Sequence, residues 1–177
     1  MTLRSIGLFV LATLLLVACG PSSAQIKSAR TARYNASASE VFQAAVAGLK
    51  DNQQVDKADP VTSTAYSKGR WYEGDGTYVA KDANDNPIVR TGAVVVSFEV
   101  KVVPDGEHFG VEVIPHVQQH RDGYAALFTI EPGSELMPGF IIGLTDSIYL
   151  SIHGRLKGNV VVPSGAAAPG ATAPAGA

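Results

Sequence analysis

The stretch VVVSFEVKV, at residues 94–102, gives the chain its clearest structural signal. Apolar and polar side chains alternate along it, and successive side chains of a β-strand point to opposite faces of the sheet. The pattern therefore predicts a strand with one buried face. The side chains expected on that face are Val94, Val96, Phe98, Val100 and Val102.

A return strand is predicted directly after this stretch. Pro104-Asp105-Gly106 is typical of a turn, and Phe109, Val111 and Val113 then alternate with polar residues. The two strands predict a hairpin over residues 93–119. Asp122-Gly123 indicates one more turn, into a further strand within residues 124–130.

Two amphipathic helices are expected on either side of the hairpin. Ser37 and Glu40 have the spacing of a capping box, and the apolar residues that follow recur at helical spacing, which predicts a helix over 38–51. A second helix is predicted over 140–157. Its apolar positions are Ile141, Leu144, Ile148, Ile152 and Leu156.

The remaining elements complete an α+β domain. Residues 29–36 are expected to form a first strand, and residues 62–72 have strand composition. Gly74-Asp75-Gly76 and residues 82–87 indicate hairpin turns. The predicted fold is an antiparallel β-sheet with two amphipathic helices packed on one face, in the order β-α-β-β-β(-β)-α.

The N-terminus has the composition of a secretory signal peptide, predicted over residues 1–18. Arg4 precedes an apolar stretch from Ile6 to Ala18, which would reach only ~20 Å as a helix. That is short of the ~30 Å hydrocarbon core of a bilayer, although a single-pass anchor is the alternative. Leu16-Val17-Ala18-Cys19-Gly20 resembles a lipobox, the signal read by the bacterial lipoprotein-processing machinery.

This resemblance implies lipidation of Cys19, the only cysteine in the chain, which has no partner for a disulfide. In that family a residue other than aspartate after the cysteine, here Gly20, favours sorting to the outer membrane. The expected location is therefore the outer membrane, lipid-anchored and facing the periplasm. The expected organisation is a flexible tether over 19–28, one domain over 29–158, and a disordered Ala/Pro/Gly-rich tail over 159–177.

The composition argues against several functions. The formal net charge is −2 with no block of basic residues, so nucleic-acid binding is not expected. His116 and His120 have a metal-ligand spacing only on a helix, whereas here they fall on a predicted strand, as does Glu112. Neither a metal site nor a cofactor is expected.

Two further clusters of polar residues are better explained by turns. Asp82, Asn84 and Asn86 imitate half of a calcium loop, but Pro87 stands where that loop needs glycine. Glu73 and Asp75 form a carboxylate pair beside aromatic residues, at a predicted hairpin tip. Since the sequence also lacks the nucleophile, zinc-protease and phosphate-loop motifs, an enzyme is not expected.

The order of elements, together with the lipobox, resembles small periplasmic lipoproteins with a helix-grip domain. The nearest is the lipoprotein C subunit of the outer-membrane β-barrel assembly machine, and the lipopolysaccharide-assembly lipoprotein is a looser likeness. The resemblance implies an accessory or interaction module in envelope assembly or maintenance, with an envelope protein as partner. A binding module for a small lipid or glycan, held between helices and sheet, is the alternative.

Three aromatic residues, Trp71, Tyr72 and Tyr78, are the candidates for partner binding. With Asp75-Gly76 as a two-residue turn, Glu73 would pair with Tyr78, and Tyr72 with Val79. Tyr72 and Tyr78 would then point to opposite faces, so at least one aromatic side chain would face away from the core. Aromatic side chains on a surface are favoured as interface anchors.

Overall fold

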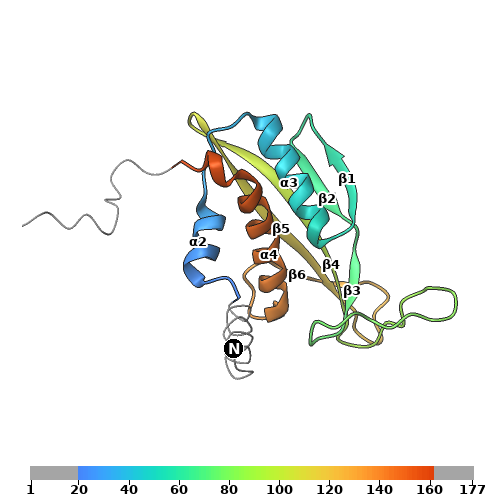
Figure 1. Ribbon diagram of the computed structural model, residues 1–177. Helices are drawn as coiled ribbons and strands as arrows, with labels where there is room; N and C mark the ends of the chain where they lie inside the picture. The colour runs from blue at the N-terminus through green and yellow to red at the C-terminus, as the bar shows by residue number, and fades with distance from the viewer. Residues whose placement is uncertain (1–19, 162–177) are drawn as a thin grey trace, which may run out of the picture.

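A computed structural model of the chain describes residues 20–161 (Figure 1). The predicted signal peptide, Cys19, and the predicted tail from residue 162 onward lie outside the described residues. The described part is an α+β fold, as the sequence predicts, with a six-stranded antiparallel sheet. The strands are β1 (Val55–Asp59), β2 (Thr64–Ser67), β3 (Arg70–Tyr72), β4 (Val94–Asp105), β5 (His108–Gln119) and β6 (Phe128–Ile130).

The long hairpin of β4 and β5 is the centre of the sheet and confirms the prediction for residues 93–119. Its register runs from Val94 opposite Gln119 to Asp105 opposite His108. The turn places Gly106 at φ 61°, in the left-handed region where glycine is favoured. The strand order is β1-β2-β4-β5-β6, and β3 pairs with β4 beyond the end of β2.

The alternation of residues 94–102 sets which face of the sheet is covered. Val94, Val96, Phe98 and Val100 are fully buried. The intervening Ser97 and Glu99 are only half-buried on the opposite face. Helices α3 (Ala38–Asn52) and α4 (Gly139–Leu156) lie across the buried face (Figure 1), so the two predicted helices and their shared layer are confirmed.

Helix α3 begins at the predicted capping box. The Ser37 hydroxyl accepts the Glu40 N–H at 3.3 Å, and the Glu40 carboxylate accepts the Ser37 N–H at 2.8 Å. These bonds satisfy two of the donors that a helix N-terminus leaves unpaired. At its other end, Asp51 bonds Arg155 of α4 at 2.6 Å, which links the ends of the two helices. None of the helices within residues 20–161 has the length and apolar character needed to cross a membrane.

An additional helix, α2 (Ser23–Thr31), corrects the prediction of a flexible tether over 19–28 and of a strand over 29–36. Ser22 and Gln25 form a second capping box, whose bonds measure 2.8 and 3.2 Å. Ala29 is buried, and Arg30 pairs with Asp146 of α4 at 2.6 Å. The segment is therefore helical because it is capped at its start and packed against α4.

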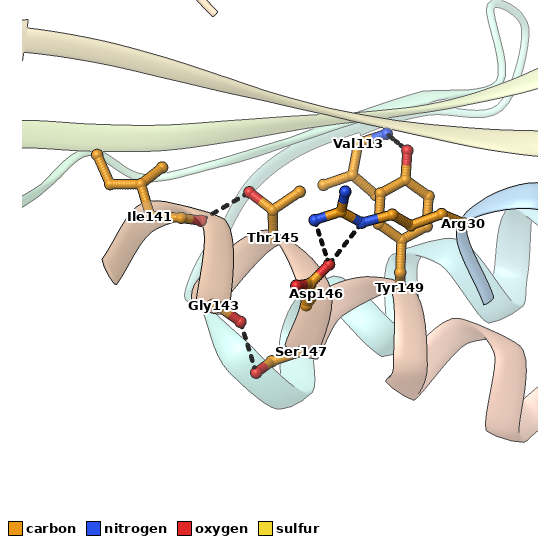
Figure 2. A network of polar contacts seen from close by, with 8 residues as sticks. All are labelled: Arg30, Val113, Ile141, Gly143, Thr145, Asp146, Ser147 and Tyr149. Atoms are coloured by element: carbon orange, nitrogen blue, oxygen red, sulfur yellow. Dashed lines mark hydrogen bonds and ion pairs between the residues drawn. The ribbon is translucent and has the colours of Figure 1, made fainter. Parts of the chain in front are cut away.

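Figure 2 shows how α4 joins α2 to the sheet. Asp146 and Tyr149 lie one turn apart on α4: Arg30 of α2 pairs with Asp146, and beside this pair the Tyr149 hydroxyl accepts the Val113 N–H of β5 at 3.0 Å. Thr145 donates to the Ile141 carbonyl at 2.8 Å, as a hydroxyl inside a helix commonly does. Polar residues thus fit within α4 without interrupting it.

The C-terminal end of the described region pairs with the segment that follows α2, beside β5. Tyr34 forms isolated bridges with both Phe109 and Val160, and the Val161 N–H donates to the Arg33 carbonyl at 2.8 Å. These two isolated bridges, and no strand, are found where the first strand was predicted. They also show that residues 159–161, predicted as the start of the disordered tail, pair with residues 33–35. Strand β1, which the sequence did not indicate, pairs with β2 at the edge of the sheet.

Candidate functional site

The hairpin that follows β3 carries the aromatic residues singled out in the sequence. The Gly76 N–H donates to the Glu73 carbonyl at 3.0 Å, and the Glu73 N–H donates to the Thr77 carbonyl at 2.8 Å. Gly76 has φ 89°, so the turn is a tight one with glycine in the left-handed position, which adds one residue to the loop. Asp75 accepts bonds from the Thr77 N–H and hydroxyl, and these bonds lower the pKa of its carboxyl.

The additional turn residue shifts the strand register by one and corrects the predicted pairing. Tyr72 lies opposite Tyr78, and the Val79 N–H donates to the Trp71 carbonyl at 3.2 Å. Tyr72 and Tyr78 therefore do not point to opposite faces. Their ring centroids are 5.2 Å apart.

Burial separates the three candidate residues. Tyr72 is only 2% exposed, packs 5.3 Å from the Phe140 ring of α4, and belongs to the core, so its prediction as a partner-binding residue is wrong. Burial also raises the pKa of its hydroxyl. Trp71 is half-buried, and Tyr78 is 62% exposed. The two residues left at the surface are thus Trp71 and Tyr78.

Trp71 and Tyr78 line one surface groove of about 590 Å³, which we call the hairpin groove. It contains three cationic side chains and one carboxylate. The residues that line it are Gln54, Lys68, Gly69, Arg70, Trp71, Tyr78, Val79, Lys81, Asp85 and Pro87.

Arg70 connects the aromatic and the cationic parts of the hairpin groove. Its guanidinium donates to the Tyr78 hydroxyl at 3.0 Å, and its central carbon lies 4.9 Å from the centre of the same ring. A cation over an aromatic face at an exposed site is worth about 0.5–1 kcal/mol. These contacts hold the exposed Tyr78 ring in place beside the groove.

The loop of residues 82–87 contributes Asp85 and Pro87 to the lining of the groove and is a turn, as the sequence indicates. The Asp82 carboxylate accepts the N–H groups of Asn84 and Asn86 at 2.8 and 2.9 Å, and these bonds lower its pKa. The Asp82 carboxylate therefore stabilises the turn through these hydrogen bonds. At the loop's base, Lys81 pairs with Asp85 at 2.8 Å.

The histidines considered as metal ligands have other neighbours. His116 lies 3.1 Å from a Glu99 oxygen of β4, and His120 lies 3.5 Å from Asp122. Glu112 is exposed on β5. Within residues 20–161, no three His, Cys, Asp or Glu side chains are grouped so as to hold a metal ion.

The cations of the hairpin groove were not among the residues predicted from the sequence. Lys68 and Arg70 directly precede Trp71 in the stretch Lys68-Gly69-Arg70-Trp71, and this adjacency was the available signal. Gln54 is brought to the same groove by folding, since its carbonyl accepts the Lys68 N–H at 2.8 Å. The structure thus adds positive charge to a site predicted only from aromatic residues.

Comparison with known proteins gives no further assignment of this site. The chain matches no protein-family model, and a search of curated proteins finds no match either.

Proposed function

We propose that the chain is a non-enzymatic outer-membrane lipoprotein that binds an envelope protein at the hairpin groove. The lipobox-like stretch from Leu16 to Gly20 supports a lipid anchor at Cys19 and a domain that faces the periplasm. In this proposal the domain serves as an accessory or interaction module in envelope assembly or maintenance. It needs neither a metal nor a cofactor for that role.

The observation that carries the proposal is the contrast between the interior and the hairpin groove. The centre of the layer between the helices and the sheet is closely packed, and Val41, Phe98 and Ile148 there are each 0% exposed. A groove of about 500 Å³ that α4 and β5 line together opens at the surface beside this core. The closely packed centre leaves no room for the alternative, a lipid or glycan held deep between the helices and the sheet. Outside, the hairpin groove offers an indole, an exposed tyrosine and an arginine, the residue types enriched in interface hot spots.

The anchor is tested with a Cys19→Ser variant. We expect intact-mass spectrometry of the membrane-extracted parent protein to show acyl chains on Cys19, because more than one chain makes membrane attachment stable. The variant should leave the outer-membrane fraction. A variant that remains in that fraction by itself would refute the anchor.

Partner binding is tested by affinity purification from crosslinked envelopes. We expect Tyr78→Ala or Trp71→Ala to reduce recovery of an envelope protein while the melting temperature barely moves, most clearly for Tyr78 because it is largely exposed. Tyr124→Ala is the matched control, since Tyr124 is 72% exposed and lies outside the hairpin groove. If all three variants recover the same amount of envelope protein, the assignment of this surface to partner binding is refuted. A large loss of melting temperature for both groove variants, without selective loss of recovery, would assign them to the core.

A further inference from the structure

The hairpin groove continues into a second surface groove of about 670 Å³ at the end of α3. Gln54 and Arg70 line both grooves, so the two form one track. The second groove is lined by Val46, Lys50, Asp51, Asn52, Gln53, Gln54, Val55 and Arg70. We call the joined surface the basic track, for the charges described next.

The basic track carries positive charge that the fold does not neutralise. Within residues 20–161, no carboxylate lies within ion-pair distance of Lys50, Lys68 or Arg70. The two carboxylates of the track are already engaged, Asp51 with Arg155 and Asp85 with Lys81. This surface is therefore cationic in a chain whose formal net charge is −2. Its electrostatic complement is an anionic partner.

The backbone along the track is also incompletely covered. Strand β1 covers the outer edge of β2 as far as Ser67, and the returning arm of the hairpin covers Trp71 and Tyr72. Gly69 lies between these two stretches, is exposed, and has no side chain to shield its peptide groups. Gly69 belongs to the break between β2 and β3, so the track exposes a short stretch of backbone there and not a strand edge. A peptide segment crossing the track can exchange a main-chain hydrogen bond with that stretch while its side chains contact the cations.

From these observations we propose that the basic track binds an extended acidic segment of the partner protein. Carboxylates of the segment contact Lys50, Lys68 and Arg70, and an apolar side chain of the segment packs against Trp71. Each groove alone has the volume of a small-molecule pocket, so the joined track accommodates a stretch of polymer. This inference rests on the proposed function, because it names the chemistry of the partner at the same site.

The test uses the full chain purified from membranes in a neutral detergent. A short fluorescent peptide of alternating glutamate and leucine is the probe, and its anisotropy measures binding. The same peptide with lysine in place of glutamate, a sulfated polysaccharide and anionic lipid vesicles are separate arms. Because Trp71 is the only tryptophan, quenching of its emission reports whether the bound peptide reaches the track.

We expect the acidic peptide to bind, to weaken as salt is added, and to quench Trp71. Arg70→Gln and Lys68→Gln should each weaken binding by up to about fivefold, as loss of one exposed charge contact does. Lys101→Gln is the matched control, because Lys101 is exposed on β4 outside both grooves and its loss should leave binding unchanged.

Equal binding of the lysine peptide, or unchanged binding by Arg70→Gln and Lys68→Gln, would overturn the inference. Binding of the polysaccharide or the vesicles without binding of the acidic peptide would also overturn it. The inference can fail separately from the proposed function. If Tyr78→Ala still abolishes recovery of an envelope protein, the surface remains a binding site and only the acidic chemistry of the partner is refuted.

Discussion

The crossing of α3 and α4 depends on a glycine, and replacing it makes a prediction whose size follows from the structure. A Cβ atom at Gly48 would lie 2.5 Å from Cγ1 of Ile152 and 3.0 Å from the Ile152 backbone nitrogen. Carbon atoms in contact ordinarily lie about 3.5–4.0 Å apart. Ile152 is buried, and its nitrogen belongs to the backbone of α4. The clash of Gly48→Ala can therefore be relieved only if the two helices separate.

Gly154→Ala provides the matched control for Gly48→Ala. Both glycines are inside helices, so alanine brings the same helix-propensity gain of about 1 kcal/mol at each. No atom lies within 4 Å of a Cβ built at Gly154, which is exposed on α4. The propensity term cancels between the two variants. What remains is the cost of overpacking at Gly48, about 1–3 kcal/mol.

The assay is urea denaturation of a soluble form that begins at Gly20, followed by circular dichroism. Gly154→Ala should be slightly more stable than the parent, and Gly48→Ala should be less stable than Gly154→Ala by about 1–3 kcal/mol. The urea dependence of the unfolding free energy should stay the same in all three proteins. If Gly48→Ala equals or exceeds Gly154→Ala in stability, the helices do not cross as closely as described.

Two further predictions concern the core and its pH dependence. Phe98→Ala should cost about 3–5 kcal/mol of unfolding free energy, because the ring is fully buried. The Glu99 side chain faces outward and contacts His116, so Glu99→Ala should cost about 1 kcal/mol or less. If Phe98→Ala and Glu99→Ala lose the same free energy of unfolding in urea denaturation, the register of β4 is contradicted. Burial and the nearby Lys157 lower the pKa of His153, whose ring lies 3.3 Å from the Tyr34 hydroxyl. Because the pKa of His153 is lower in the folded chain, the unfolded chain binds more protons just below about pH 6.5. The folded state therefore loses stability as the pH falls through this window. We expect thermal melts of His153→Gln to show a smaller loss of stability between neutral and mildly acidic pH than those of the parent protein.

Strong periodicity made the centre of the fold predictable. The alternation of residues 94–102 and the capping box before α3 are local signals. In both cases the structure that the signal predicts is also the one that packs against the core. The helix over residues 139–156 was predictable for the same reason, since its apolar positions include Ile141, Ile148, Ile152 and Leu156, all buried. Local preference and tertiary packing favour the same conformation at these residues.

The elements that were not predicted depend on distant partners. Helix α2 has only one buried residue, Ala29, and its contact through Arg30 is with a residue of α4 far along the chain. Strand β1 reads VDKAD, a sequence without an apolar face, and forms because β2 offers an edge to pair with. Ser22 and Gln25 did provide a local capping signal for α2. The small polar composition around them resembled a tether.

The candidate site shows the same division at the level of single residues. The turn signal Gly74-Asp75-Gly76 was enough to locate the hairpin, but which aromatic ring is exposed depends on one turn residue. A loop with Gly76 in the left-handed position moves the pairing by one, and Phe140 then covers Tyr72 while Tyr78 stays at the surface. Gly76 is required there for a second reason, since a Cβ atom would lie 2.8 Å from Cγ of Phe140. The contact between the hairpin tip and α4 therefore fixes the register and leaves Tyr78 beside Arg70 and the basic track.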